Sequence, residues 1–273
     1  MNQLTKITVI TVAFNSERTI ERTIQSVVSQ NYENLEYWII DGASTDRTVE
    51  IVRNYAQKYS FIRYISEPDE GISDAFNKGI SKATGELIGL INSDDQLMDG
   101  ALSAIHTRYC KTSADILYGD TIVDDVENRL RLYKKAGLPE LLKYEMPFIH
   151  QSCFVRRTVY EECGGYSSKY KICMDYDMFA RIYHKGYKFA DVGSVISIFQ
   201  YGGTSCKHPI KTINENMRIA SKYGLTKAEV FKYKFRVISR NVMKLILSKM
   251  GIWSFLYKRI KKDSVIGNVN KEL

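Results

Sequence analysis

The chain has 273 residues, of which 44% are hydrophobic, which is enough to bury a large core and argues against a disordered chain. Its five cysteines are scattered, odd in number and without a Cys-x-x-Cys pair, which argues against a disulfide framework and against a structural zinc site. The sequence has neither a charged-then-apolar leader nor an apolar run near the roughly 20 residues that span a bilayer. We therefore expect a cytoplasmic protein.

The net charge of +8 is concentrated near the C-terminus. Between Lys207 and Lys262 there are 15 Lys or Arg and only two Glu, so the remaining residues are net acidic. The sequence contains no recognisable nucleic-acid reading module, and these basic residues are interleaved with apolar residues at helical spacing. The charge pattern therefore argues against a nucleic-acid partner.

Strand-like and helix-like segments alternate through the first hundred residues. The β-rich runs are residues 7–14, 36–40, 62–65 and 87–91. We expect Asn15 or Ser16 to cap the helix after the first run, and Ser44 or Thr45 to cap the helix after the second. A third helix carries the apolar residues between 72 and 83 on one face. This alternation predicts an α/β fold, with a parallel sheet built from right-handed crossovers and helices on both faces.

The strand at residues 87–91 is the segment around which this fold is organised. Its aliphatic residues indicate burial on both faces, and it ends abruptly at Asn92, Ser93, Asp94 and Asp95. Two adjacent carboxylates repel each other and lose hydration near a core, so such a pair usually holds a cation or a hydroxyl-rich ligand. The alternative interpretation is an ordinary solvated turn after a strand.

The other predicted strands also end in residues suited to binding a ligand. Phe14, Asp41 and the segment 67–71 follow the first three strands. Because ligands of parallel sheets bind beyond the carboxyl ends of the strands, we expect one pocket to collect these residues together with Asp94 and Asp95. The sequence has no G-x-G-x-x-G turn after the first strand and no G-x-x-x-x-G-K-[ST] loop. A bound pyrophosphate would lack a glycine-rich cradle, which favours a metal ion held by carboxylates.

Several of these segments together resemble one family. The segments TVAFN (residues 11–15), DGASTD (41–46), DEG (69–71), NKG (77–79) and NSDD (92–95) occur in the order and spacing of the family 2 glycosyltransferases of the GT-A fold. The resemblance extends from about Ile7 to about Asp191. It implies a mainly parallel nucleotide-binding sheet flanked by helices, and an enzyme that transfers a sugar from a nucleotide sugar.

The resemblance also implies roles for individual residues. Phe14 matches an aromatic residue against the uracil, although core packing is the alternative for this side chain. Asp41 matches a carboxylate that binds the base, and Asp94 one that approaches the ribose. Asp95 matches the ligand of a Mg²⁺ or Mn²⁺ cofactor that bridges the diphosphate. The donor-binding residues expected on this basis are Phe14, Asp41, Glu67, Asp69, Gly71 and Asp94. The family pattern at Phe14 and Asp41 favours UDP as the nucleotide.

A second set of polar residues lies in the middle of the chain. Apolar residues at helical spacing put Asp175 in the first turn of a helix, where a carboxylate is favoured. By resemblance, Asp175 is the general base of a single displacement that inverts the anomeric configuration, although Met174 replaces the usual Glu of the family. Helix capping is the alternative role for Asp175, and Asp177 is the rival base. His150 and Gln151 are candidate contacts to the acceptor or to a phosphate, with a structural role as the alternative for His150.

The region between these two sets of residues shows short elements. We expect strands at residues 116–118, 121–123 and 129–133, arranged as a ribbon, and a brief helix at 138–144. The processive synthases of the family carry a Gln-x-x-Arg-Trp motif and transmembrane helices, and neither follows Asp175. The resemblance therefore implies an enzyme that adds one sugar and releases its product.

The C-terminal segment combines helical patterns with basic residues. Apolar patches, including Trp253, Phe255 and Tyr257, suit docking on an anionic membrane surface, and packing of a helical appendage on the catalytic domain is the alternative. We expect a catalytic domain at residues 1–205, divided into a nucleotide-sugar-binding half (1–100) and an acceptor-binding half (101–205). A basic amphipathic helical region follows at 206–273, with frayed residues at 262–273.

The expected partners are a nucleotide sugar and a saccharide acceptor. By the habit of the family, the acceptor is carried on a polyprenyl diphosphate in the inner leaflet, as in the assembly of bacterial surface polysaccharides. This would place the protein peripherally on the inner face of the cell membrane. The alternative function is a non-catalytic member of the same fold that binds a nucleotide or acts as a membrane-associated partner.

Overall fold

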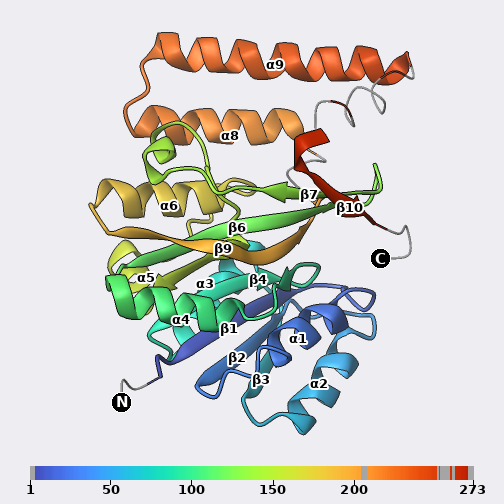
Figure 1. The fold of residues 1–273 in the computed structure, drawn as a ribbon, viewed down its shortest axis with the longest axis vertical. Coiled ribbons are helices and arrows are strands. Elements are labelled where there is room, and N and C mark those ends of the chain that lie inside the picture. The colour runs from blue at the N-terminus through green and yellow to red at the C-terminus, as the bar shows by residue number, and fades with distance from the viewer. Residues whose placement is uncertain (1–3, 204–207, 251, 253–258, 260–261, 270–273) are drawn as a thin grey trace.

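The computed structural model describes residues 4–203, 208–250, 252, 259 and 262–269. The N-terminal half consists of strands joined by helices (Figure 1): β1 (Ile7–Ala13), α1 (Ile20–Val28), β2 (Leu35–Asp41), α2 (Thr48–Lys58), β3 (Ile62–Ser66), α3 (Ile72–Lys82) and β4 (Leu87–Asn92). β1 pairs in parallel with both β2 and β4, and β2 pairs in parallel with β3. The predicted alternation and the parallel pairing are therefore confirmed.

Side chains of the central strands alternate between two hydrophobic clusters. In β1, Ile10 and Val12 pack in one cluster with Phe76 of α3, whereas Ile7 packs in the other with Ile24 of α1. Successive residues of a strand point to opposite faces, so a strand covered on both sides is buried at every position. All seven residues of β1 are buried, as this pattern requires.

The second half extends the sheet with strands of mixed direction. Its elements are β5 (Gln96–Leu97), α4 (Ala101–Thr112), β6 (Ile116–Asp125), β7 (Leu130–Lys134), η1 (Pro139–Lys143), η2 (His150–Ser152), β8 (Cys153–Arg156), α5 (Arg157–Cys163), α6 (Met174–His184) and β9 (Phe189–Gln200). β8 pairs antiparallel with β4 and β6, and β9 pairs in parallel with β6. The predicted ribbon is confirmed as the antiparallel pair of β6 and β7, and the predicted brief helix is the 3₁₀ helix η1.

The two strands expected at 116–118 and 121–123 form one continuous strand, β6. A Cβ atom at Gly119 would lie 2.6 Å from the backbone oxygen of Ser194 and 2.5 Å from the side chain of Ile196. The glycine therefore permits close approach of β9, and the register between β6 and β9 shifts at this point. Gly119 marks an irregularity in one strand instead of a break between two.

The expected helix caps are wrong for the first two helices. α1 begins after Thr19, and α2 begins after Arg47. The Asn15 side chain accepts a hydrogen bond from the backbone N–H of Thr45 at 2.9 Å, and the Ser44 hydroxyl donates to Asp41 at 2.5 Å. The Ser44 hydroxyl also accepts the backbone N–H of Asn15 at 2.8 Å, so Asn15 and Ser44 join the loops after β1 and β2 to each other instead of capping the helices that follow.

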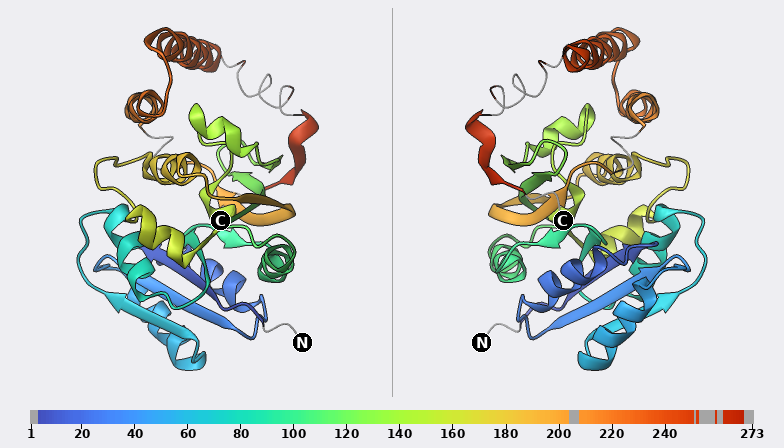
Figure 2. Two further views of the ribbon diagram at one scale, coloured as in Figure 1. Left: turned by 90° about the vertical axis from the view of Figure 1, so that its left-hand side faces the viewer. Right: turned by 90° about the vertical axis from the view of Figure 1, so that its right-hand side faces the viewer.

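Two further helices and a short strand follow. α8 (Pro209–Lys222) lies between α6 and α9 (Lys227–Lys249) in every view of Figures 1 and 2. Ile219 and Ala220 of α8 are buried in the same cluster as Ile182 of α6. α8 therefore shares a hydrophobic core with residues on the other side of the boundary predicted at 205. Trp253, Phe255 and Tyr257 lie outside the described residues.

The prediction that residues 262–273 are frayed is wrong for their first part. η3 (Lys262–Ser264) leads into β10 (Val265–Asn268), which pairs antiparallel with β7 because Val265 packs on the small cluster of Val123, Leu130 and Leu132. The strand order of the main path is β10-β7-β6-β8-β4-β1-β2-β3. Within the described part of the chain, no helix has both the length and the hydropathy that a membrane span requires.

Candidate active site

The carboxyl ends of the parallel strands bring the predicted nucleotide-binding residues to one edge of the sheet. Ala13, the last residue of β1, lies beside Asp41, the last residue of β2. Val12 lies beside Asn92, the last residue of β4. The polar and aromatic residues that follow these strands therefore start from the same edge, as the topology of a parallel sheet predicts.

Phe14 is an exposed aromatic side chain at this edge. It is 62% exposed, so the alternative of core packing is excluded. A Cβ atom at Gly42 would lie 3.5 Å from the Phe14 ring and 2.5 Å from a carboxylate oxygen of Asp69. Phe14 and Asp69 thus flank a position that is kept open by the lack of a side chain at residue 42.

Asp41 is buried at the same edge, and its carboxylate already has several donors. It accepts hydrogen bonds from the backbone N–H of Ser44 at 3.0 Å, from the Ser44 hydroxyl at 2.5 Å and from the Ser66 hydroxyl at 2.6 Å. These bonds fix the loop after β2 on the end of β3. A direct contact between Asp41 and a base stays a prediction.

The segment Glu67–Gly71 forms the entry to α3. Glu67 pairs with Lys78 at 3.1 Å, and Asp69 accepts the backbone N–H of Gly71 at 2.9 Å. Gly71 precedes the helix with a φ of 115°, a value that favours glycine. The segment is thereby held in one conformation beside Phe14.

The two adjacent carboxylates after β4 have different environments. Asp95 is fully buried, where it accepts hydrogen bonds from the backbone N–H of Gln200 at 2.8 Å and from Nε2 of Gln151 at 2.5 Å. Burial, reinforced by the neighbouring Asp94 carboxylate, raises the pKa of Asp95 well above its usual value. Asp94 is only partly buried, and it lines a large cavity, which we call the main cavity and describe below. Metal binding by Asp95 stays a prediction, but the carboxylate that faces the cavity is that of Asp94.

The main cavity has a volume of about 910 Å³ and is lined from both halves of the chain. Asn92 and Asp94 come from the end of β4, His150 and Gln151 from η2, and Asp175 from the first turn of α6. Four of these five residues were predicted as site residues from regions up to 81 positions apart. The structure therefore brings Asp94 of the first predicted set onto one cavity with His150, Gln151 and Asp175 of the second. The expectation that one pocket collects the whole first set is not met, because the residues that line this cavity do not include Phe14, Asp41, Asp95 or the segment 67–71.

Asp175 is held from two sides. One of its carboxylate oxygens accepts the backbone N–H of Tyr176 at 2.7 Å, and the other lies 3.6 Å from Nδ1 of His150. The imidazole in turn packs edge-on against the ring of Phe76 at 5.8 Å. The rival base, Asp177, is almost fully buried, pairs with Arg181 at 2.9 Å and does not line the cavity.

Four buried polar atoms of residues that line the cavity have no hydrogen-bond partner within the described residues: Asn92 Oδ1, His150 Nε2, Gln151 Oε1 and the Tyr176 hydroxyl. Unpaired buried polar atoms are costly, so their presence beside Asp94 indicates a polar ligand. Among the described residues no group of three or more His, Cys, Asp or Glu is placed to hold a metal ion. The oxygen atoms beside Asp94 fit a hard cation that is held by one carboxylate and completed by water and substrate phosphates.

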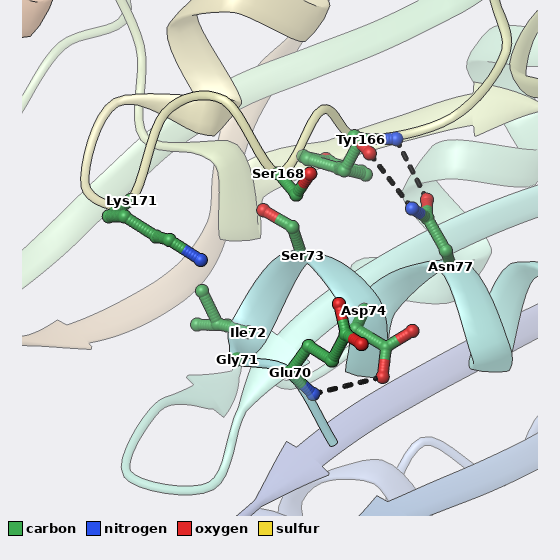
Figure 3. Close-up of a pocket in the computed structure, with 9 residues that line it drawn as sticks. All are labelled: Glu70, Gly71, Ile72, Ser73, Asp74, Asn77, Tyr166, Ser168 and Lys171. Carbon is green, nitrogen blue, oxygen red and sulfur yellow. Dashed lines mark hydrogen bonds between the residues drawn. The ribbon is translucent and has the colours of Figure 1, made fainter.

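A smaller cavity of about 240 Å³, whose lining is drawn in Figure 3, shares Ile72 and Lys171 with the main cavity. It lies between the start of α3 and the loop after α5. Asn77 of α3 holds this loop by accepting the backbone N–H of Tyr166 and donating to its carbonyl oxygen, both at 2.8 Å. The sequence did not predict the contacts of Asn77 with Tyr166 or of Gln200 with Asp95, because these partners are distant in the sequence.

Comparisons with known proteins show which family the chain belongs to. Residues 8–166 match the model of the family described as Glycosyl transferase family 2, which is more than half of the chain. The protein belongs to this family. Cholesterol galactosyltransferase of Borreliella burgdorferi is 35% identical over 112 residues, which cover 41% of this chain and only 31% of that protein. The protein named "Putative glycosyltransferase EpsE" of Bacillus subtilis is 29% identical over 199 residues, which cover 69% of this chain and 70% of EpsE.

Two solved structures share the fold of this glycosyltransferase. S. aureus TarS 1–349 in complex with UDP-GlcNAc has a TM-score of 0.65 and 18% identity, covering 91% of this chain and 78% of that one. The mannosyltransferase PcManGT of Pyrobaculum calidifontis, in complex with GDP-Man and Mn²⁺, has a TM-score of 0.64 and 17% identity, covering 86% and 70%. The expected GT-A fold is therefore confirmed.

Proposed function

We propose that the protein is an inverting glycosyltransferase that moves one sugar from a UDP-sugar to an acceptor hydroxyl, with Asp175 as the general base. The observation that carries this proposal is that Asp94 and Asp175, one from each half of the chain, line the same cavity. The cavity is thus lined by Asp94, the carboxylate proposed for the diphosphate side, and by Asp175, the carboxylate proposed for the acceptor side. Sugar transfer by a single displacement uses a base within reach of the acceptor hydroxyl, the role proposed for Asp175.

In this proposal Asp175 takes the proton of the acceptor hydroxyl while that oxygen attacks the anomeric carbon. The bond between this carbon and the diphosphate oxygen breaks, and the electron pair leaves with the nucleoside diphosphate. Attack from the opposite face inverts the anomeric configuration. His150 limits the orientations of the Asp175 carboxylate because it is itself packed against Phe76.

Mg²⁺ or Mn²⁺ is the proposed cofactor, with Asp94, Asn92 and Gln151 as the residues that would hold it. When bound, such a cation would supply positive charge for the diphosphate leaving group. Support comes from the unpaired Asn92 and Gln151 oxygens and from the PcManGT complex, which contains Mn²⁺. The exposed ring of Phe14 supports a nucleotide base at the sheet edge, and TarS binds a UDP-sugar.

The decisive test measures nucleotide release from a panel of UDP-sugars with added Mn²⁺. We expect Asp175→Asn to lower turnover by about 10²–10⁴-fold, the usual contribution of a general base. UDP binding, measured by calorimetry, should survive because Asp175 lies on the acceptor side. Asp99→Asn is the matched control, since Asp99 is exposed and lines neither cavity. UDP binding without any turnover that depends on Asp175 would favour the non-catalytic alternative.

The proposed acceptor is a saccharide carried on a polyprenyl diphosphate, and α9 is the proposed contact to an anionic membrane. Val230 and Tyr233 of α9 pack toward α8, whereas Phe231 and Phe235 are 69% and 67% exposed. With Val242 and Ile246 they form an exposed apolar stripe on a helix that carries a single acidic residue, Glu229, among seven Lys and Arg. A basic helix with an exposed apolar face suits the surface of anionic lipids.

Co-sedimentation with phospholipid vesicles tests this membrane contact. We expect binding to vesicles with anionic lipid and loss of binding when Phe231 and Phe235 are both changed to Ser. Binding that is equal for neutral and anionic vesicles, or unaffected by the double substitution, would contradict the proposal. Turnover of a water-soluble acceptor should be unchanged in this variant, because neither residue lines the cavity.

A further inference from the structure

The start of α6 lacks a cap from its own sequence. Cys173 is the residue before the helix, and no side chain caps the helix locally. Instead, Glu215 of α8 reaches the three preceding backbone N–H groups. One carboxylate oxygen accepts from Lys171 at 3.2 Å, and the other accepts from Ile172 at 2.9 Å and Cys173 at 3.0 Å. Glu215 thus binds the N-cap residue and the two residues before it, not the N–H groups inside the helix, from more than 40 positions further along the chain.

This contact is strong by its chemistry. Glu215 is only 7% exposed, so the three hydrogen bonds to its carboxylate are shielded from water. A carboxylate at the N-terminus of a helix also interacts favourably with the helix dipole. Removal of the carboxylate would take away the acceptor of three backbone N–H groups, of which that of Cys173 is buried and those of Lys171 and Ile172 are nearer to solvent.

The segment held by Glu215 forms part of the main cavity. Lys171, Cys173 and Asp175 all line the cavity, and so do Thr212 and Asn216 of α8, the positions three before and one after Glu215. The Cys173 thiol also donates to the carbonyl oxygen of Thr212 at 3.5 Å. α8 therefore packs against the segment that leads to Asp175.

We propose that Glu215 is a positioning residue for the general base: it fixes the backbone of residues 171–173 and thereby sets where the Asp175 carboxylate lies in the cavity. This inference rests on the proposed role of Asp175. Proton transfer requires the base within hydrogen-bond reach of the acceptor hydroxyl, and a displacement of about 1 Å costs about 10²-fold in rate. Since α8 lies beyond the residues 8–166 that match the family model, the C-terminal part of the chain completes the active site.

The test compares Glu215→Gln with the wild-type chain. The amide can accept with one oxygen only, and its NH₂ group opposes the remaining N–H donors. We expect kcat for sugar transfer to fall at least about 10-fold, whereas the KM for the donor and the Kd for UDP stay within about twofold. Hydrogen exchange of the backbone amides at 171–173 should accelerate. Glu215→Asp, which keeps the charge on a shorter side chain, should retain more activity than Glu215→Gln.

Glu229→Gln is the matched control. Glu229 accepts the backbone N–H of Thr226 at 2.9 Å at the start of α9, so it also serves a helix N-terminus, but it does not line the cavity. This variant should keep the wild-type kcat. A Glu215→Gln protein with unchanged kcat would overturn the inference, and so would one in which UDP affinity and thermal stability fall as much as kcat, because that pattern indicates general destabilisation.

The design separates the two proposals. If Asp175→Asn abolishes turnover and Glu215→Gln does not reduce it, only the inference about Glu215 fails. If no turnover depends on Asp175, the proposed function fails, and the hydrogen-exchange arm then decides on its own whether Glu215 holds residues 171–173. If Glu215→Gln does not fold, the same measurements on Glu215→Asp decide: unchanged kcat and unchanged amide exchange overturn the inference.

Discussion

The different environments of Asp94 and Asp95 predict that the two carboxylates respond in opposite ways to the same substitution. In Asp95→Asn, the new side chain can still accept from the backbone N–H of Gln200, but its NH₂ group meets the NH₂ group of Gln151. A buried donor without an acceptor costs about 1–3 kcal/mol, so we expect a loss of this size in the free energy of unfolding. Asp94→Asn should change it by less than about 0.5 kcal/mol, as for most substitutions outside the core.

Nucleotide binding should show the reverse pattern. Asp94 lines the cavity beside the unpaired oxygens of Asn92 and Gln151, so its loss removes the charge proposed to hold the cation. We expect the affinity of Asp94→Asn for UDP in the presence of Mn²⁺ to fall at least about 10-fold, which corresponds to about 1.4 kcal/mol of binding free energy. Without a metal ion, the affinities of Asp94→Asn and of the wild-type chain should be equal.

The assays are urea unfolding and calorimetric titration with UDP, each with and without Mn²⁺, on both variants and on Asp99→Asn as a control. Asp95→Asn should be less stable and should keep the metal dependence of UDP binding. The reasoning is refuted if Asp95→Asn loses the metal-dependent binding at unchanged stability while Asp94→Asn retains it. Asp95 would then be the metal ligand, as the family resemblance implies.

Two further predictions concern the nucleotide edge and the opposite end of the sheet. Phe14→Ala should weaken UDP binding by about 1–3 kcal/mol, the range for stacking of a base on an aromatic side chain. It should leave the melting temperature unchanged because Phe14 is exposed. Calorimetric titration with UDP and thermal unfolding measure the two effects, and an unchanged UDP affinity would exclude base stacking on Phe14. Glu36 accepts hydrogen bonds from the Thr8 hydroxyl at 2.7 Å and from the Thr84 backbone N–H at 2.8 Å. Burial alone would raise the pKa of Glu36, but the hydrogen bonds from Thr84 and Thr8 bring this pKa below its usual 4.5. The charged form is thus favoured by folding, so its contribution to stability is complete above about pH 4.5 and is lost as the pH falls through the lower folded-state pKa. Glu36→Gln should be about 1–3 kcal/mol less stable than the wild-type chain at pH 7, and urea unfolding at decreasing pH should show the difference shrinking in acid, whereas a difference independent of pH would contradict this account.

Local sequence patterns were enough to predict the framework of the nucleotide-binding half. The runs at 7–14, 36–40, 62–65 and 87–91 correspond to β1 to β4, and parallel pairing placed their carboxyl ends at one edge. A strand that is buried on both faces appears in the sequence as a short run of mainly aliphatic residues, and a helix as apolar residues at helical spacing. Helix starts were predicted less well, because Asn15 and Ser44 bond to neighbouring loops and not to the helices that follow them.

The roles of the polar residues depended on contacts between distant segments. The order of the motifs predicted Asp94 and Asp175 as site residues. The sequence could not distinguish the roles of Asp94 and Asp95, because they are adjacent and chemically identical. Only the structure shows that Asp95 is buried and bound by Gln151 and Gln200, from η2 and β9, whereas Asp94 is partly buried and lines the cavity. Asp175 and Asp177 also differ through distant contacts, since Arg181 and Lys222 pair with Asp177, whereas His150 lies beside Asp175.

The sequence by itself thus determined the alternation of strands and helices, the family, and the list of residues at the strand ends, because each leaves a local or motif-level signal. Only the tertiary structure decided which carboxylate faces the cavity, that His150 lies beside Asp175, and that Glu215 of α8 caps the segment before α6. Hydrogen bonds between residues far apart in the chain have no periodicity, and burial of a single side chain depends on every element packed around it.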